Sequence, residues 1–160
     1  RDPHIWLSPK RVMVMIDVIA KELSGFDPQN RSFYEKNAQD YIKELEELDS
    51  EIRKTLSNIK NRTFIVYHPA FGYFADDYGL NMIAIEKEGK EATAKDLQNV
   101  IDTAKSEGIK VVFYQAETDS KQARTLAEEI GGKVQMLEPL SADYINNLKK
   151  MANTFVEAAE

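Results

Sequence analysis

Two kinds of hydrophobic pattern divide the chain. Up to about residue 60, apolar residues recur at steps of three and four, which is the spacing of one helix face. From Thr63 onward, short apolar runs rich in β-branched and aromatic residues alternate with helical segments. The first part therefore predicts long helices, and the second part predicts alternating strands and helices.

The first helix is expected over residues 9–23. Ser8 is a residue type that caps helix N-termini, Pro9 fits the first helical turn, and Gly25 is expected to end the helix. Its apolar residues cover more than one face, so this helix needs cover on two sides. That surface either belongs to the core of this domain or was made for another lobe.

The longest periodic segment runs from Asp27 to about Lys60, with neither Gly nor Pro after Pro28. A helix of about 30 residues is roughly 45 Å long. A compact domain of this size has a radius of gyration of only about 15 Å. We therefore expect this helix to extend beyond a single lobe and to act as a strut between two lobes. Its broad, irregular apolar stripe does not favour a coiled coil.

The remaining pattern predicts the fold class. It gives strands at residues 63–67, 81–86, 110–115 and 133–137, separated or followed by helices at residues 71–78, 93–108, 121–130 and 142–158. Strands that alternate with helices indicate right-handed crossovers and a parallel sheet. We predict an α/β fold in which a four-stranded, parallel, doubly wound sheet is flanked by helices and preceded by the long strut helix.

Composition narrows the function classes. The 160 residues suit one compact domain with at most a small appendage, and the net charge of −6 argues against a nucleic-acid surface. No apolar run approaches the length that crosses a membrane, and no signal peptide is visible. Because the chain has no cysteine, any metal site must use His and carboxylate ligands.

Candidate ligands follow the strands. In an open parallel sheet, ligands bind beyond the carboxyl ends of the strands, which share one edge. The residues expected there are His68, Glu86, Glu88, Glu117, Asp119 and Glu138. The only other histidine is His4, and two scarce imidazoles at element boundaries are typical of one shared ion. The alternative is that each histidine is a hydrogen-bonded packing residue.

Known catalytic and nucleotide-binding motifs are missing. No strand is followed by GxGxxG or by a Walker lysine pattern, and the chain contains neither a nucleophile elbow nor HExxH. Nucleophilic and metalloprotease chemistry therefore have little support.

Three ordered segments resemble a known family. Asp2-Pro3-His4-Ile5-Trp6-Leu7-Ser8-Pro9, Tyr67-His68-Pro69-Ala70-Phe71-Gly72-Tyr73-Phe74 and Leu137-Glu138-Pro139-Leu140 are similar to motifs of the metal-binding solute receptors of ABC importers. This is the zinc and manganese uptake group, which includes streptococcal metal-binding adhesin lipoproteins. The resemblance extends over essentially the whole chain.

The resemblance implies a set of metal ligands. His4 matches the ligand of the first motif, and His68 matches the ligand at the strand end. A histidine at this second position is typical of zinc-type members, whereas manganese-type members usually carry Glu, so zinc is favoured and manganese is the alternative. Glu138 stands where the family has a final Asp ligand. Gln115 replaces a usual Glu, which leaves the role of Glu117 open.

The resemblance also implies a domain organisation, because these receptors have two α/β lobes joined by a rigid helix with the ion between the lobes. Residues 1–26 would belong to the edge of a missing N-terminal lobe, residues 27–60 would form the interdomain helix, and residues 61–160 would form the C-terminal lobe. We expect a truncated chain that holds at most three of four ligands.

The expected function is therefore that of an extracytoplasmic receptor, not an enzyme, that captures Zn²⁺ and delivers it to the membrane permease of an ABC importer. Apolar surface on the first helix is expected to favour self-association. One alternative is a small zinc-dependent hydrolase with Glu117 or Glu138 as general base. Another is an adhesive surface module that does not need the histidines.

Overall fold

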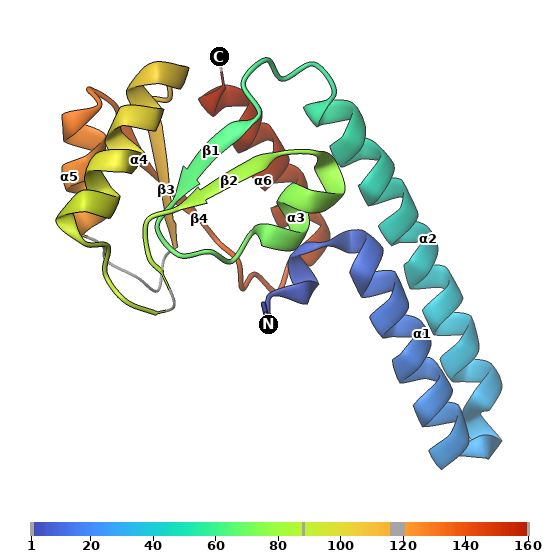
Figure 1. The fold of residues 1–160 in the computed structure, drawn as a ribbon. Helices are drawn as coiled ribbons and strands as arrows, with labels where there is room; N and C mark the ends of the chain where they lie inside the picture. Colours follow the sequence, from blue (N-terminus) through green and yellow to red (C-terminus); the bar gives the residue numbers. More distant parts are fainter. Residues whose placement is uncertain (1, 88, 116–120, 160) are drawn as a thin grey trace.

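The sheet has the predicted parallel, doubly wound topology. The computed structural model describes residues 2–87, 89–115 and 121–159. In it, all four strands are parallel and are ordered β2-β1-β3-β4. Figure 1 shows the arrangement of these strands, which are β1 (Thr63–Val66), β2 (Asn81–Ala84), β3 (Val111–Gln115) and β4 (Lys133–Leu137).

Two hydrophobic cores lie on opposite faces of the sheet because neighbouring strand residues point to alternate sides. One core joins Phe64, Val66 and Phe113 to helices α2 (Arg31–Leu56), α3 (Gly72–Tyr78) and α6 (Tyr144–Ala158). At its centre, the ring of Phe155 packs against the rings of Phe64, Phe71, Phe74 and Phe113.

The second core covers the other face. Ile65 and Val112 pack there with residues of α4 (Ala94–Glu107) and α5 (Lys121–Glu129). The sheet is therefore buried on both faces between layers of helices, as expected for parallel strands.

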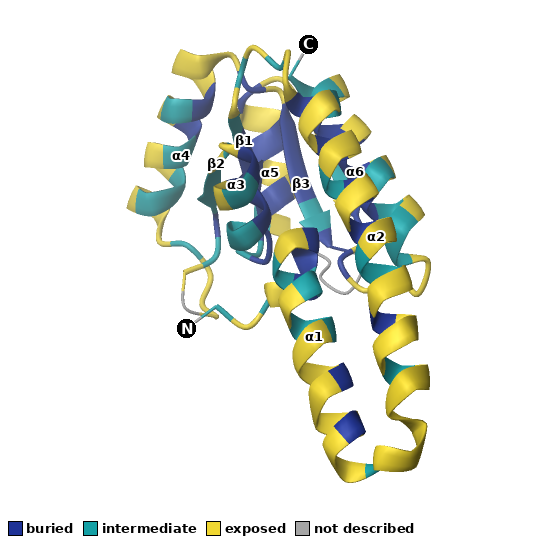
Figure 2. Cartoon of the chain, turned by 90° about the vertical axis from the view of Figure 1, so that its right-hand side faces the viewer, coloured by how far each residue is buried: buried dark blue, intermediate teal, exposed yellow. Residues whose placement is uncertain are grey.

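A helical arm projects from this α/β body (Figure 1). It consists of α1 (Pro9–Phe26), a 3₁₀ turn (Pro28–Asn30) and the first half of α2. The second half of α2 belongs to the body, where Leu45, Leu48, Ile52 and Leu56 are buried in the first core. Figure 2 shows that most residues of the projecting part are exposed.

Several helix boundaries differ from the sequence prediction, including the end of the long helix, which lies at Leu56 rather than near Lys60. Gly25 does not end the first helix, which continues to Phe26. The long helix begins at Arg31 rather than at Asp27, because residues 28–30 form a 3₁₀ turn. Asp27 does not cap that turn; its carboxylate instead accepts hydrogen bonds from the side chains of Asn30 and Tyr34. These two hydrogen bonds lower the pKa of Asp27.

None of the described helices is long and apolar enough to span a membrane.

Candidate metal centre

His68 lies at the carboxyl edge of the sheet, two residues after β1. The chain there still follows the sheet, because the backbone N–H of Tyr67 donates to the carbonyl of Phe113 on the neighbouring strand at 2.8 Å. β1 and β3 are neighbours in the sheet, and the connection from β1 to β2 leaves in the opposite direction to the connection from β3 to β4. Such a switch point is where ligands bind in open α/β sheets.

His4 reaches the same edge from the start of the chain, immediately before a 3₁₀ turn (Ile5–Leu7). Three hydrogen bonds hold this segment to the α/β body. The indole N–H of Trp6 donates to the carbonyl of Pro139 at 2.9 Å. The Tyr144 hydroxyl donates to the carbonyl of Trp6, and the Tyr73 hydroxyl donates to the carbonyl of Asp2. His4 is therefore positioned by contacts on both sides of it.

The two imidazoles face each other through the same type of nitrogen. The distance from His4 Nε2 to His68 Nε2 is 3.3 Å, and the ring planes are nearly perpendicular at 82°. Two nitrogens bound to a tetrahedral zinc ion at about 2.0–2.1 Å lie about 3.3–3.4 Å from each other. The observed separation of the two nitrogens thus fits a single bridging ion.

A carboxylate lies within hydrogen-bond distance of the other ring nitrogen, Nδ1, of each histidine. His4 Nδ1 lies 2.7 Å from Asp2 Oδ1, and His68 Nδ1 lies 3.1 Å from both carboxylate oxygens of Glu86. A carboxylate accepts a hydrogen bond but cannot donate one when ionised. With Nδ1 as donor, each Nε2 carries a lone pair that is free to bind a cation.

Glu138 follows β4 but is separated from His68 by an intervening strand, because β3 lies between β1 and β4. Its side chain is exposed, and its carbonyl accepts a hydrogen bond from the Asn147 amide at 2.7 Å. Among the described residues, no group of three or more His, Asp or Glu side chains is arranged to hold one ion. The structure thus brings His4 and His68 together, and Glu138 as a third ligand stays a prediction.

The other residues predicted to lie at strand ends differ in whether they contact the histidine pair. Glu86 contacts His68, whereas Glu88, Glu117 and Asp119 lie outside the described residues. Gln115 is 8% exposed, and its side-chain N–H₂ has no hydrogen-bond partner among the described residues.

Sequence reasoning missed the role of Asp2. The signal was its position two residues before a histidine, which is close enough for the carboxylate to reach both the backbone and the ring of His4.

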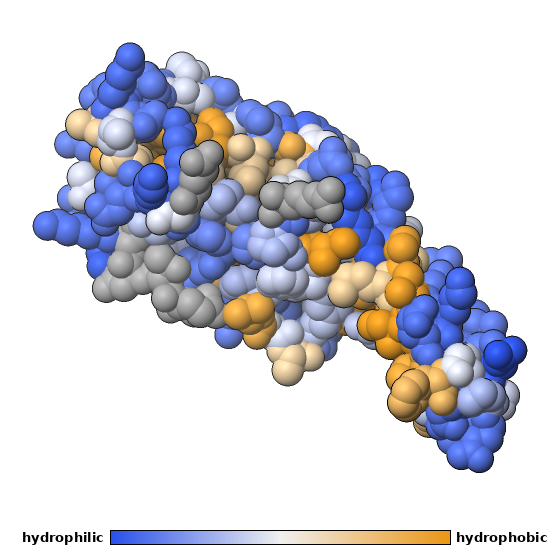
Figure 3. Space-filling model, turned by 60° about the horizontal axis from the view of Figure 1, so that its bottom comes forward, coloured by the Kyte–Doolittle hydropathy of each residue, from blue (hydrophilic) through white to orange (hydrophobic). Residues whose placement is uncertain are grey.

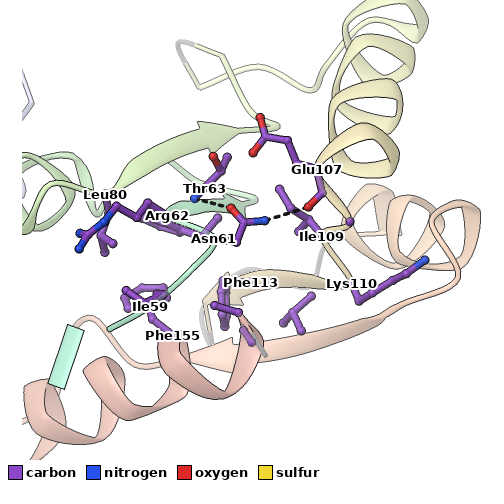
Figure 4. A pocket seen from close by; sticks show the side chains of 15 residues that line it. Ile59, Asn61, Arg62, Thr63, Leu80, Glu107, Ile109, Lys110, Phe113 and Phe155 are labelled. Atoms are coloured by element: carbon purple, nitrogen blue, oxygen red, sulfur yellow. Dashed lines mark hydrogen bonds between the residues drawn. The ribbon is translucent and has the colours of Figure 1, made fainter. Parts of the chain in front are cut away.

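Another cavity, of about 190 Å³, lies at the opposite end of the strands (Figure 4). Three of its polar side chains are hydrogen-bonded to the backbone. Asn61 bonds to the carbonyl of Glu107 and to the N–H of Thr63, Arg62 bonds to the carbonyls of Tyr78 and Gly79, and Lys110 bonds to the carbonyl of Ile130. No histidine lines this cavity. The histidine pair is therefore the better candidate for a metal site.

Comparisons with known proteins agree with this geometry. Residues 1–158 match the family described as ZnuA, zinc-uptake complex component A, periplasmic. The chain is 40% identical over 141 residues to the zinc-binding protein AdcA of Streptococcus pyogenes serotype M1, a match that covers 87% of this chain and 27% of AdcA.

Solved structures give the same result. A crystal structure of ZnuA superposes with a TM-score of 0.96 at 44% identity, covering 99% of this chain and 62% of that chain. The laminin-binding protein Lmb of Streptococcus agalactiae, described as bifunctional with adhesin and metal-transporting activity, gives a TM-score of 0.91 at 28% identity and covers 99% and 64%. The chain thus spans about a quarter of AdcA and less than two thirds of each of these solved chains.

Proposed function

Because this chain belongs to the ZnuA family of periplasmic zinc-uptake components, we propose that it captures Zn²⁺ outside the cytoplasm for the permease of an ABC importer. His4 and His68 bind the ion through Nε2, and Glu138 supplies a carboxylate ligand. The observation that carries the proposal is the 3.3 Å separation of the two Nε2 atoms. Zinc is favoured over manganese because imidazole suits zinc, whereas manganese prefers oxygen ligands.

The site suits a receptor that releases its ion. The His4 and His68 side chains are 16% and 30% exposed, so solvent reaches the pair. Imidazole must be unprotonated to bind a metal, so affinity falls as the solution is acidified. Loading and release then depend on ligand exchange and need no covalent step.

Calorimetric zinc titration tests the histidine pair. His4→Ala and His68→Ala should each weaken zinc binding by more than about tenfold, which corresponds to about 1.4 kcal/mol. Glu46→Ala is a matched control, because it removes an exposed acid from the second half of α2 and should leave the affinity unchanged. If His68→Ala and the unmodified chain bind zinc equally well, His68 does not belong to the site.

The family consists of zinc-uptake components, not enzymes, and the hydrolase alternative has no support among the relatives. We propose that the chain carries out no catalysis. The zinc-loaded protein should hydrolyse ester and phosphate substrates no faster than free Zn²⁺ does. A rate above that background which disappears in His68→Ala would favour the hydrolase.

An adhesive role is the second candidate, because Lmb is described as both an adhesin and a metal transporter. Zinc capture depends on the two histidines, whereas a purely adhesive role does not. Surface binding to laminin that survives replacement of both histidines would favour adhesion independent of metal.

Self-association is a further part of the proposal. Figure 3 shows apolar side chains gathered on the helical arm, and α1 lines a hollow of about 570 Å³ there. We define the arm patch by the residues that line this hollow and are apolar: Ile5, Val14, Met15, Val18 and Ile19. A second copy that places the same patch against this one would remove apolar surface from water, and the contact would be isologous.

A further inference from the structure

Both histidines make the same arrangement, although they come from distant parts of the chain. In each histidine, Nδ1 is within hydrogen-bond distance of a carboxylate, and Nε2 points to the other imidazole. We propose that Asp2 and Glu86 are positioning residues, which fix the tautomer and the orientation of His4 and His68 before an ion arrives. The zinc-binding part of this inference rests on the proposed function, whereas the tautomer part stands without it.

Asp2 is itself held in place. One carboxylate oxygen, Oδ1, accepts from the backbone N–H of His4 at 2.9 Å and lies 2.7 Å from its Nδ1, so it clamps the residue at two points. The carbonyl of Asp2 accepts a hydrogen bond from the Tyr73 hydroxyl at 3.1 Å. The other carboxylate oxygen lies against Gly72, where an added Cβ would be 2.9 Å away. Gly72 therefore leaves the space that this carboxylate occupies.

Glu86 is placed by the register of the sheet. Val66 of β1 is opposite Ala84 of β2, and the pairing continues because the backbone N–H of Glu86 donates to the carbonyl of Tyr67 at 2.9 Å. His68 and Glu86 therefore lie at the ends of neighbouring strands, each two residues after the paired residues Val66 and Ala84. The Glu86 side chain is only 13% exposed, and both of its oxygens lie 3.1 Å from His68 Nδ1.

These contacts have a chemical consequence. A carboxylate that accepts from Nδ1–H keeps the proton on that nitrogen and leaves the Nε2 lone pair free. It also stops rotation of the ring about χ2, which would exchange the two ring edges. The site is thus preorganised, and the ion does not have to reorient either imidazole when it binds.

The test combines nitrogen-15 NMR of the metal-free protein with zinc titration. At mildly alkaline pH, where imidazole is neutral, both histidines of the unmodified chain should carry the proton on Nδ1. Glu86→Ala should convert His68 to a tautomer mixture and leave His4 unchanged, and Asp2→Ala should do the reverse. Each variant should also bind zinc about 10–100-fold more weakly.

Conservative variants separate positioning from charge. In Glu86→Gln and Asp2→Asn, the amide oxygen can still accept from Nδ1–H, so the tautomer should be retained and the loss of affinity should be smaller than in the alanine variants. Gly72→Ala should shift the Asp2 carboxylate and perturb His4 alone. Glu128→Ala, an exposed acid on α5, is the control and should change neither readout.

The possible outcomes are distinct. Histidine spectra that stay unchanged in Asp2→Ala and Glu86→Ala would overturn the positioning role. Shifted tautomers with unchanged zinc affinity would overturn the zinc-binding part of the inference. If the unmodified chain binds no zinc, the proposed function fails, and the NMR comparison still decides whether the two carboxylates orient the imidazoles.

Discussion

At the scale of residues, a buried polar group with a defined partner controls its own ionisation. Tyr78 is a clear case, because it is 6% exposed and its hydroxyl donates to Asp49 at 2.9 Å. Burial, followed by the charge and the hydrogen bond of Asp49, raises the pKa of Tyr78 well above its usual 10.0. The folded state therefore favours the neutral, protonated form of the Tyr78 phenol.

This raised pKa predicts an alkaline loss of stability. Above about pH 10 the unfolded tyrosine loses its proton while the folded one keeps it, so the unfolded state binds fewer protons and the free energy of unfolding falls as pH rises. One such proton corresponds to about 1.4 kcal/mol per pH unit.

Urea denaturation of the unmodified chain and of Tyr78→Phe checks this. The variant should show a shallower decline above pH 10, and near neutral pH it should be less stable by about 1 kcal/mol because the hydrogen bond to Asp49 is lost. Identical slopes for the two proteins would contradict the assignment.

At the scale of elements, the connection from α5 to β4 requires a residue without a side chain. A Cβ at Gly132 would lie 2.0 Å from the carbonyl oxygen of Lys110, the residue immediately before β3. The backbone N–H of Lys133 donates to that same carbonyl at 2.8 Å. Any side chain at Gly132 must therefore separate the backbones where β3 and β4 begin to pair.

Gly132→Ala should destabilise the protein by about 1–3 kcal/mol or more, as over-packing does. Gly25→Ala is the matched control, since Gly25 lies inside α1 with nothing within 4 Å of an added Cβ. There the helix preference of Ala over Gly predicts a gain of about 0.5–1 kcal/mol. Thermal unfolding of both variants measures the two opposite shifts, and equal shifts would refute this account of the turn.

Local signals in the sequence predicted the elements well. The side chain of Thr93 accepts from the backbone N–H of Asp96 at the start of α4, and Gly108 ends that helix with φ +70°. The boundaries that were wrong depended on more than local preference. Gly25 remains helical, and Asp27 bonds to the side chains of Asn30 and Tyr34 instead of capping a helix.

The site could be predicted only in part for a related reason. The local sequence pattern shows which residues follow each strand, and this pattern identified His68 and Glu86 as candidates. The order of the strands is a tertiary property, and the position of β3 between β1 and β4 decides how far Glu138 lies from His68. The convergence of His4 on His68 was proposed from the scarcity of histidine and strengthened by the family resemblance, because a separation of 64 residues carries no geometric information by itself.

At the scale of the whole molecule, most of the exposed large apolar side chains among the described residues lie on the arm rather than on the α/β body. Exposed residues on α1 include Val14, Val18 and Leu23, and Phe26 at its end is 93% exposed. Contiguous apolar surface of this kind marks an interaction face in soluble proteins. Self-association through the arm patch is the expected result.

Sedimentation velocity over a wide concentration range tests this expectation. The unmodified chain should show a concentration-dependent dimer, and Val18→Glu should shift it to monomer because a charge in the centre of the patch would be buried without a partner. Asn99→Glu, at an exposed position of α4, is the control and should leave the dimer unchanged. A clean monomer for the unmodified chain at every concentration would contradict the proposal.

The domain division predicted from sequence, with residues 1–26, 27–60 and 61–160 as separate parts, stays a prediction. Its central segment has two environments in the structure. The first half of α2 pairs with α1 in the arm, and the second half contributes Leu45, Leu48, Ile52 and Leu56 to the core of the body.

X-ray absorption spectroscopy at the zinc edge shows directly whether the two histidines bind the ion. The zinc-loaded chain should show the multiple-scattering signature of two imidazoles, with nitrogen at about 2.0–2.1 Å, and His4→Ala should reduce this to one. A spectrum that contains only oxygen ligands and is the same in both proteins would contradict the capture of zinc by the histidine pair.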